Sequence, residues 1–117
     1  MSDLLGPLPP AEFRSDGCTG APDAVPGQSG GVVCIRDACR MHDYAYHVGG
    51  TETDRRVADA RLMANMLILG ADAAFAMTYY RAVRVFGPFS VKRGWQYKPH
   101  TGSISRIWYM LLAIARG

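Results

Sequence analysis

A stripe of polar and reactive side chains follows one face of a predicted helix in the first half of this 117-residue chain. Residues spaced i, i+3, i+4 and i+7 share a helix face, and here those positions hold Cys39, His42, Asp43 and Tyr46. In an ordinary amphipathic helix the same positions are aliphatic and face the core. Because burying such groups costs free energy unless they find partners, the stripe predicts a functional site held on a helix.

Two helical patterns can be read around this stripe. The first helix is expected over residues 33–48, where a pair of glycines ends it. Thr51 or Thr53 can cap a second helix over residues 54–86, which ends at a glycine–proline pair. Gly70 is a point at which this long run can bend or divide. Helices joined by a short turn usually lie antiparallel and side by side, so the two predicted helices should face each other.

The remaining segments differ in composition. Residues 1–12 are rich in proline and are expected to form an irregular arm, and residues 13–31 are dense in Gly, Pro, Ser and Asp, which predicts a loop. Residues 87–117 carry aromatic and basic side chains, with a last helix expected over residues 104–115. No apolar run reaches the ~20 residues that a membrane span requires. We therefore expect one mainly α-helical domain over residues 1–117, with two antiparallel helices, a preceding loop and an additional C-terminal helix.

The predicted second helix carries an acid on an otherwise apolar face. Asp59 shares this face with Leu62, Met63 and Met66. A buried acid needs a partner, and His42 on the facing helix can supply one. In the other interpretation, Asp59 lies near the helix start and is half solvated.

His42 and Asp43 together offer two kinds of chemistry. Neighbouring residues on a helix diverge by about 100°, so these side chains can converge on one ligand but do not bond to each other. An imidazole can take a proton from water near neutral pH, and a carboxylate can bind a hard cation such as Ca²⁺, which takes about six to eight oxygen ligands. The loop around Asp16, Gly17 and Thr19 offers further oxygens. A cation beside a water-activating histidine indicates ester hydrolysis.

The three cysteines permit one disulfide. A bridge between Cys18 and Cys39 would anchor the loop one helical turn before His42, and closing a loop of ~20 residues stabilises a fold by ~3 kcal/mol in the chain-entropy account. This pairing is the favoured one and leaves Cys34 as the free thiol, and a bridge between Cys18 and Cys34 is the alternative. As an alternative function, Cys18, Cys34, Cys39 and His42 could form a small structural zinc site.

At these residues the chain resembles the secreted-type phospholipases A2, and is most similar to their short prokaryotic and viral members. The resemblance covers residues 13–70. It is carried by three matches: the helix motif Cys39-x-x-His42-Asp43-x-x-Tyr46, the upstream loop Asp16-Gly17-Cys18-Thr19, and the pair Ala58-Asp59 on the following helix. The many-disulfide framework of animal members is missing, and residues 87–117 match no part of the family.

The resemblance implies calcium-dependent hydrolysis of the sn-2 ester of glycerophospholipids. In this family the histidine is the general base, which corresponds to His42, and the tyrosine and second-helix acid that support it correspond to Tyr46 and Asp59. The implied Ca²⁺ ligands are Asp43, Asp16 and the carbonyl oxygens of Gly17 and Thr19.

Charge is unevenly distributed along the chain. All ten acids lie at or before Asp72, whereas seven basic residues and no acid follow from Arg81 onward: Arg81, Arg84, Lys92, Arg93, Lys98, Arg106 and Arg116. A basic segment suggests an anionic partner, although charge alone favours the interpretation of a solvated tail. A phospholipid surface is the expected peripheral partner, with the aromatic side chains Trp95, Tyr97, Trp108 and Tyr109 at the surface, and nucleic acid is the less favoured one.

The N-terminal residues show neither the basic region nor the long apolar region of a signal peptide. Three settings are compatible with this: the sequence is a mature form, it is exported by another route, or it is carried in a particle. A third candidate function, a catalytically silent component of such a particle, is compatible with the basic segment. The sequence indicates no oligomeric state.

Overall fold

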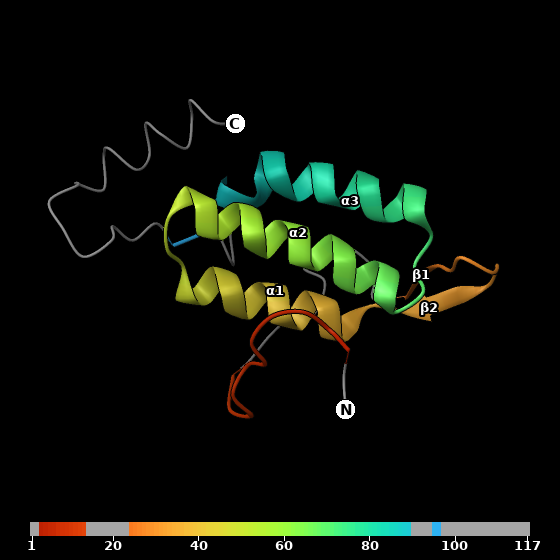
Figure 1. The fold of residues 1–117 in the computed structure, drawn as a ribbon, viewed down its shortest axis with the longest axis horizontal. Coiled ribbons are helices and arrows are strands. Elements are labelled where there is room, and N and C mark those ends of the chain that lie inside the picture. The colour runs from red at the N-terminus through yellow and green to blue at the C-terminus, as the bar shows by residue number, and fades with distance from the viewer. Residues whose placement is uncertain (1–2, 14–23, 90–94, 97–117) are drawn as a thin grey trace, which may run out of the picture.

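The computed structural model describes residues 3–13, 24–89 and 95–96, and Figure 1 shows these as a mainly helical fold with a small hairpin. The elements, in chain order, are β1 (Ala24–Pro26), β2 (Val32–Cys34), α1 (Arg36–Val48), α2 (Glu52–Ile68), α3 (Ala73–Phe86) and the short 3₁₀ helix η1 (Gly87–Phe89). The expectation of a mainly α-helical chain is therefore confirmed. The expected helix over residues 104–115 lies outside the described residues.

The central helix is α2, which packs against α1 on one side and α3 on the other (Figure 1). Each helix runs opposite to its neighbour in the chain, because the connections between them are short. The antiparallel arrangement expected for the first two helices is present, so residues of the reactive stripe on α1 can face α2.

A two-stranded hairpin precedes α1. In it β1 and β2 pair antiparallel with Val25 opposite Val33, and the turn between them contains Gly30 and Gly31, both at positive φ. Two expectations were wrong here: residues 13–31 are not wholly loop, and α1 begins at Arg36 because Val33 belongs to a strand. The β-branched residues at the start of the expected helix are better accommodated in an extended backbone.

The start of α2 is fixed by a capping box. The Thr51 side chain accepts a hydrogen bond from the backbone N–H of Asp54, and the Asp54 carboxylate accepts one from the N–H of Thr51. Thr51, not Thr53, is therefore the cap, and α2 begins at Glu52. Reciprocal bonds of this kind satisfy two N–H groups that have no partner within the helix.

The long predicted helix over residues 54–86 is divided. Gly70 has a φ of +100°, which an L side chain rarely adopts, and it separates α2 from α3. Asp72 then caps α3 by accepting from the N–H of Phe75 at 3.0 Å. The chain reverses at Gly70, and α3 consequently packs back along α2.

The apolar core lies between the hairpin and the C-terminal half of α2. Its buried members come from β1, all three helices and the connections between them: Val25, Ile35, Ala38, Cys39, Leu62, Met66, Ala71 and Ala76. Within the described ranges no helix is long and apolar enough to cross a bilayer.

Residues 3–13, here called the N-terminal strap, cross the outer face of α1 and α2. Asn65 on α2 holds the strap by two hydrogen bonds to one residue: its amide oxygen accepts from Leu5 N–H at 2.6 Å and its amide nitrogen donates to Leu5 C=O at 2.9 Å. Farther along, Arg40 of α1 donates to the carbonyls of Pro10 and Phe13 at 3.2 and 3.3 Å. The strap is thus tied to both helices.

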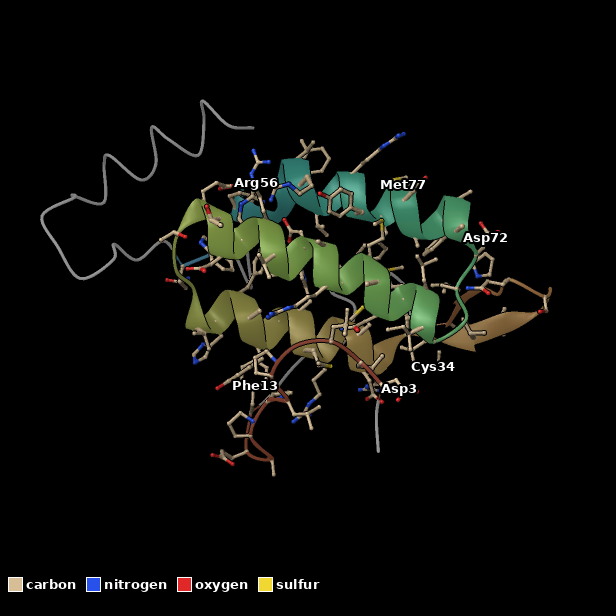
Figure 2. All side chains as sticks on the ribbon, in the orientation of Figure 1. Asp3, Phe13, Cys34, Arg56, Asp72 and Met77 are labelled. Atoms are coloured by element: carbon tan, nitrogen blue, oxygen red, sulfur yellow. The ribbon has the colours of Figure 1, made fainter. Side chains whose placement is uncertain are left out.

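The strap ends on the outer face of α1. The Phe13 ring packs against Tyr44 and His47, at centroid distances of 5.2 and 5.5 Å, and lies beside α1 in Figure 2. Tyr44 and His47 therefore have a packing role, which agrees with their position off the reactive stripe.

Candidate active site

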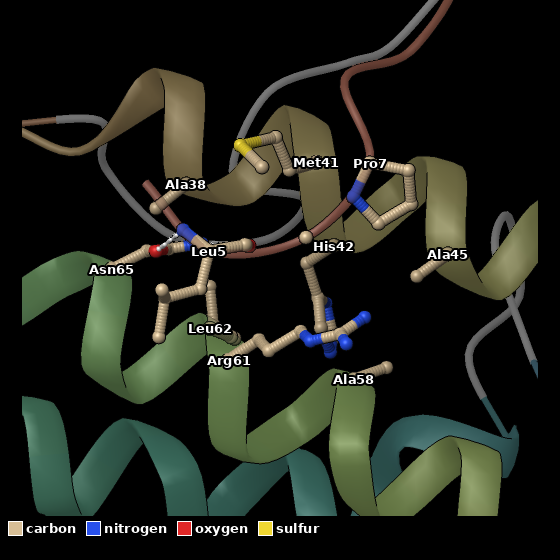
Figure 3. Close-up of a pocket in the computed structure, with 11 residues that line it drawn as sticks. Leu5, Pro7, Ala38, Met41, His42, Ala45, Ala58, Arg61, Leu62 and Asn65 are labelled. Carbon is tan, nitrogen blue, oxygen red and sulfur yellow. Dashed lines mark hydrogen bonds between the residues drawn. The ribbon is translucent and has the colours of Figure 1, made fainter. Parts of the chain in front are cut away.

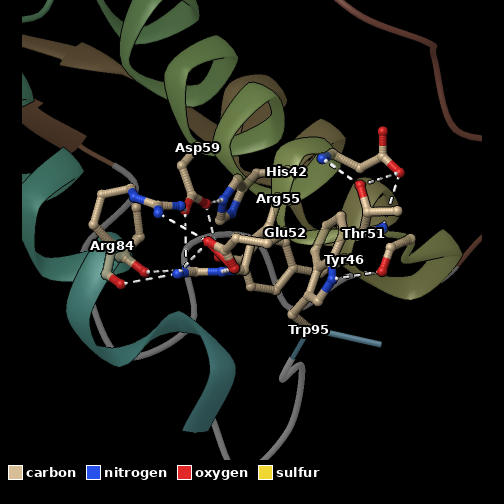
Figure 4. Close-up of polar contacts among 11 residues, drawn as sticks. His42, Tyr46, Thr51, Glu52, Arg55, Asp59, Arg84 and Trp95 are labelled. Atoms are coloured by element: carbon tan, nitrogen blue, oxygen red, sulfur yellow. Dashed lines mark hydrogen bonds and ion pairs between the residues drawn. The ribbon is translucent and has the colours of Figure 1, made fainter. Parts of the chain in front are cut away.

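A histidine–aspartate pair connects α1 to α2. His42 Nε2 lies 2.8 Å from Oδ1 of Asp59, whose side chain is completely buried, whereas the His42 side chain retains 11% exposure (Figure 4). The interpretation in which Asp59 is half solvated was wrong. The two residues come from facing helices, as their places on the two predicted helix faces indicated.

The partners of Asp59 fix the direction of this hydrogen bond. Its Oδ2 accepts from Nη1 of Arg55 at 3.2 Å and from Nη1 of Arg84 at 2.9 Å. A carboxylate that accepts from two guanidinium groups is ionised and has no proton to give. Nε2 of His42 is consequently the donor toward Asp59, and in the neutral ring Nδ1 is the basic nitrogen.

Tyr46 completes the contacts of Asp59. Its hydroxyl donates to Oδ1 of Asp59 at 2.7 Å, and its ring centroid lies 4.4 Å from that of His42. Burial, followed by the charge of Asp59 and the hydrogen bond to it, raises the pKa of Tyr46 well above its ordinary value. The phenol therefore remains a donor at neutral pH and holds Oδ1 in place beside the imidazole.

Asp59 belongs to an ion-pair quartet, which we define as Glu52, Arg55, Asp59 and Arg84; the first three are buried and Arg84 is half-buried. Arg55 donates through Nε to Oε2 of Glu52 at 3.1 Å, and Arg84 donates through Nη2 to Oε1 of Glu52 at 2.9 Å (Figure 4). Two carboxylates and two guanidinium groups balance in formal charge. This balance allows three of these charged groups to be buried beside a half-buried fourth.

The two arginines of the quartet are held firmly in their charged form. Burial is the largest single effect on the pKa of Arg55 and lowers it, but the opposing effects, led by the hydrogen bond to Glu52, together outweigh burial and raise the pKa. The same balance, with bonds to Glu52 and then Asp59, raises the pKa of Arg84. Arg55 also donates to the carbonyls of Val83 and Arg84, which joins α2 to the end of α3.

Sequence reasoning did not identify three members of the quartet. Glu52, Arg55 and Asp59 are spaced i, i+3 and i+7, so the helix-face rule could have found the first two. Arg84 gave no such signal, because it lies on another helix. The expectation that Arg84 contributes its charge to an external anionic partner was wrong, since this charge is already paired with Glu52 and Asp59.

Trp95 and Gly87 enclose Tyr46 from the C-terminal side. The Trp95 ring meets Tyr46 edge to face at 5.0 Å, is 5% exposed, and donates from Nε1 to the carbonyl of Gly50 at 3.2 Å. The expectation that Trp95 lies at a lipid surface was therefore wrong. A side chain at Gly87 would collide with the Tyr46 hydroxyl, so this glycine allows α3 to end directly over the phenol.

His42 also lines a small pocket between α1, α2 and the N-terminal strap (Figure 3). The other lining residues are mostly apolar: Leu5, Gly6 and Pro7 from the strap, Ala38, Met41 and Ala45 from α1, and Ala58, Arg61, Leu62 and Asn65 from α2. This mostly apolar lining is suitable for contact with hydrocarbon, and it lies on the face of α1 that carries the imidazole.

The residues predicted to bind calcium are only partly within view. Asp43 follows His42 on α1 and is buried, at 7% exposure, while Asp16, Gly17 and Thr19 lie outside the described residues. Among residues 3–13, 24–89 and 95–96 no group of three or more His, Cys, Asp or Glu side chains could hold a metal ion. A buried carboxylate is suitable chemistry for a calcium ligand, and the described part of the chain supplies this single member of the set.

The cysteines have different states. Cys39 is disulfide-bonded, whereas Cys34 is a free, exposed thiol. The possible bridge between Cys18 and Cys34 is therefore wrong, and Cys18 itself lies outside the described residues. A sulfur in a disulfide cannot serve as a thiolate ligand, so Cys39 is not available to a zinc site in this state.

Comparison of the chain with protein-family models, with curated proteins and with solved structures found no match.

Proposed function

We propose that this chain is a calcium-dependent hydrolase of the phospholipase A2 type, which cleaves the sn-2 ester of glycerophospholipids with water. The observation that carries this proposal is the pairing of His42 with a fully buried, ionised Asp59 at the edge of an apolar pocket. The resemblance to secreted-type phospholipases A2 in residues 13–70 gives the same assignment of roles.

In the proposed reaction, Nδ1 of His42 takes a proton from a water molecule as the water oxygen bonds to the ester carbonyl carbon. Asp59 accepts from Nε2 throughout, so the ring keeps its orientation and the imidazolium is stabilised. The bond from that carbon to the glycerol oxygen then breaks, and the proton passes from Nδ1 to the departing oxygen. The products are a fatty acid and a lysophospholipid.

The oxyanion that develops on the carbonyl oxygen requires positive charge nearby. Calcium held by Asp43, with oxygens of Asp16, Gly17 and Thr19, would supply this charge when bound. Tyr46 and the arginines of the quartet act at a distance from the substrate, by holding Asp59.

The proposed substrate surface is a membrane, contacted peripherally. Two leucines of the strap near the pocket are exposed, Leu5 at 48% and Leu8 at 71%, and apolar side chains beside a pocket favour contact with lipid. The disulfide at Cys39 supports the proposed secreted or particle-associated setting, because disulfides persist outside reducing compartments.

The test is release of fatty acid from phospholipid vesicles by the purified protein, with Ca²⁺ or with a calcium chelator. We expect release to depend on Ca²⁺ and to come from the sn-2 position of lipids with two different acyl chains. His42→Gln should lower the rate by about 10³-fold, whereas the matched variant His47→Gln, on the exposed face of the same helix, should keep it.

Two results would contradict the proposal in different ways. Release that persists in the chelator would remove the role of the cation, and full activity of His42→Gln would remove the general base. Stoichiometric zinc in the purified protein, lost in Cys34→Ser, would favour the zinc-binding alternative, and a silent site with salt-sensitive binding to nucleic acid would favour a particle component.

A further inference from the structure

We propose that Arg61 binds the phosphate group of the substrate and so selects phosphodiester lipids over neutral esters. This inference rests on the proposed function, because it assigns a residue to recognition of the same substrate. One feature of the pocket supports it: Arg61 lines the pocket, and no acidic side chain in the lining balances its positive charge.

The charge of Arg61 is uncompensated within the pocket. None of the residues that line the pocket with it is acidic, and the other charged or titratable member is His42. In the described part of the chain Arg61 makes neither a hydrogen bond nor an ion pair, in contrast to Arg55 and Arg84, which each bond two carboxylates.

The stem of Arg61 is held while its head is accessible. A Cβ added at Gly6 would lie 3.2 Å from Cδ of Arg61, so the strap backbone, at a φ of +106°, leaves room for the aliphatic part of this side chain. The residue as a whole is exposed. In Figure 3 the guanidinium extends toward the His42 ring, into the same pocket.

The substrate has an anion at a suitable place. In a glycerophospholipid, the phosphate is attached to the glycerol carbon next to the one that carries the sn-2 ester. An ester held for attack beside His42 therefore brings the phosphate within reach of a neighbouring side chain on α2. Guanidinium binds phosphate oxygens through two parallel hydrogen bonds, and Asp59, the nearest acid on this helix, is already committed to the quartet.

The binding test uses a water-soluble dihexyl ether of glycerophosphocholine, which has the phosphate but no ester to hydrolyse, and the matching dihexyl glycerol ether, which has no phosphate. Calorimetry with Ca²⁺ present compares the wild type with Arg61→Gln and Arg61→Lys. Arg81→Gln is the matched control, because it removes the same charge from an exposed site on α3 outside the pocket.

We expect Arg61→Gln to weaken binding of the phosphocholine ether by about 10- to 100-fold, the range for loss of a charged hydrogen-bond pair, with partial recovery in Arg61→Lys. Binding of the glycerol ether should be unchanged, and Arg81→Gln should bind both as the wild type does. With a hydrolysable dihexanoyl phosphatidylcholine, Arg61→Gln should raise KM by a similar factor and change kcat by less than about threefold.

The outcomes separate the two proposals. If the wild type binds the phosphocholine ether through Arg61 but hydrolyses no ester, the proposed function fails and the phosphate site stands. Three results would overturn the phosphate site. The wild type and Arg61→Gln could bind the phosphocholine ether equally well, the wild type could fail to bind it, or Arg61→Gln could lose the same affinity for both ethers. Inhibition of hydrolysis by the product hexanoate is measured as well. If Arg61→Gln weakens this inhibition but not the binding of the phosphocholine ether, Arg61 recognises the carboxylate product and the phosphate site is overturned.

Discussion

The two ends of α2 bury their side chains in different ways. Toward its C-terminus, Leu62 and Met66 pack in an apolar cluster, where stabilisation follows the area removed from water and has little directionality. Toward its N-terminus, the helix buries the quartet and the pair of His42 with Asp59. Burying ions costs so much desolvation that such a cluster contributes little net stability while complete, yet loss of one member is costly. The comparison indicates that one end stabilises the fold and the other fixes a geometry.

The largest effect should come from removing the acid shared by both parts of the polar end. Asp59→Ala leaves two arginines with one carboxylate between them, and we expect the free energy of unfolding to fall by about 3–5 kcal/mol, together with loss of ester hydrolysis. Urea denaturation measures the first effect and the vesicle assay the second. Asp59→Asn, which keeps the shape, controls for packing; a loss below about 1 kcal/mol for Asp59→Ala would contradict the idea of an interdependent quartet.

The matching change at the apolar end is Met66→Ala. This fully buried side chain leaves a cavity when truncated, and we expect the free energy of unfolding to fall by about 3 kcal/mol. Hydrolysis per folded molecule should be unchanged at a temperature where the variant remains folded, because Met66 does not line the pocket. A specific loss of activity in Met66→Ala would mean that the two ends are not separable.

Tyr46→Phe should lower the free energy of unfolding by a smaller amount, about 1–3 kcal/mol, because the buried Asp59 oxygen loses a hydrogen-bond donor. This change also carries a pH signature. A raised pKa means that the folded protein keeps the phenol proton where the unfolded chain loses it. The contribution of this group to the free energy of unfolding is therefore complete below the ordinary pKa of 10.0. It declines as pH rises above that value, by up to ~1.4 kcal/mol per pH unit.

Denaturation measured at a series of pH values from neutral to alkaline should show this decline for the wild type. The decline should be weaker in Tyr46→Phe by the contribution of one group. Tyr44→Phe, on the outer face of α1, is the matched control and should retain the full pH dependence. Identical curves for Tyr46→Phe and the wild type would mean that burial and Asp59 do not raise the pKa of this phenol.

The smallest effect is expected for Cys34→Ser. This thiol is free and exposed, so the change in stability should stay within about 0.5 kcal/mol, and hydrolysis should be unchanged. Calorimetric denaturation and the vesicle assay check both. A large loss of stability would place Cys34 in a role that neither end of α2 explains.

Much of the polar site could be predicted from helix periodicity alone. His42 and Tyr46 share a face on α1, and Asp59 stood out as an acid on an apolar face of α2, so a contact between them followed from the need of a buried acid for partners. Arg84 could not be placed in this way. Its contact depends on how α3 packs after the reversal at Gly70, which is a tertiary property with no local pattern.

The fold shows the same division between local and long-range information. The cap at Thr51 and the break at Gly70 come from side-chain and backbone preferences of single residues. The hairpin was missed because its strands have three residues each, too few to show an alternation, and because Val32 and Val33 continue into the pattern of α1. Short strands are specified by pairing rather than by their own sequence.

The neutrality of the quartet has a consequence for behaviour in salt. Mobile ions screen charges that face water over about 8–10 Å, but they act much less on pairs that are buried. Raising the ionic strength should therefore leave the imidazole oriented as before, while it should weaken the proposed attraction between accessible cations of the protein and an anionic bilayer. In a series of measurements at increasing ionic strength, adsorption to the bilayer should become slower, while the rate of hydrolysis of monomeric substrate should stay the same.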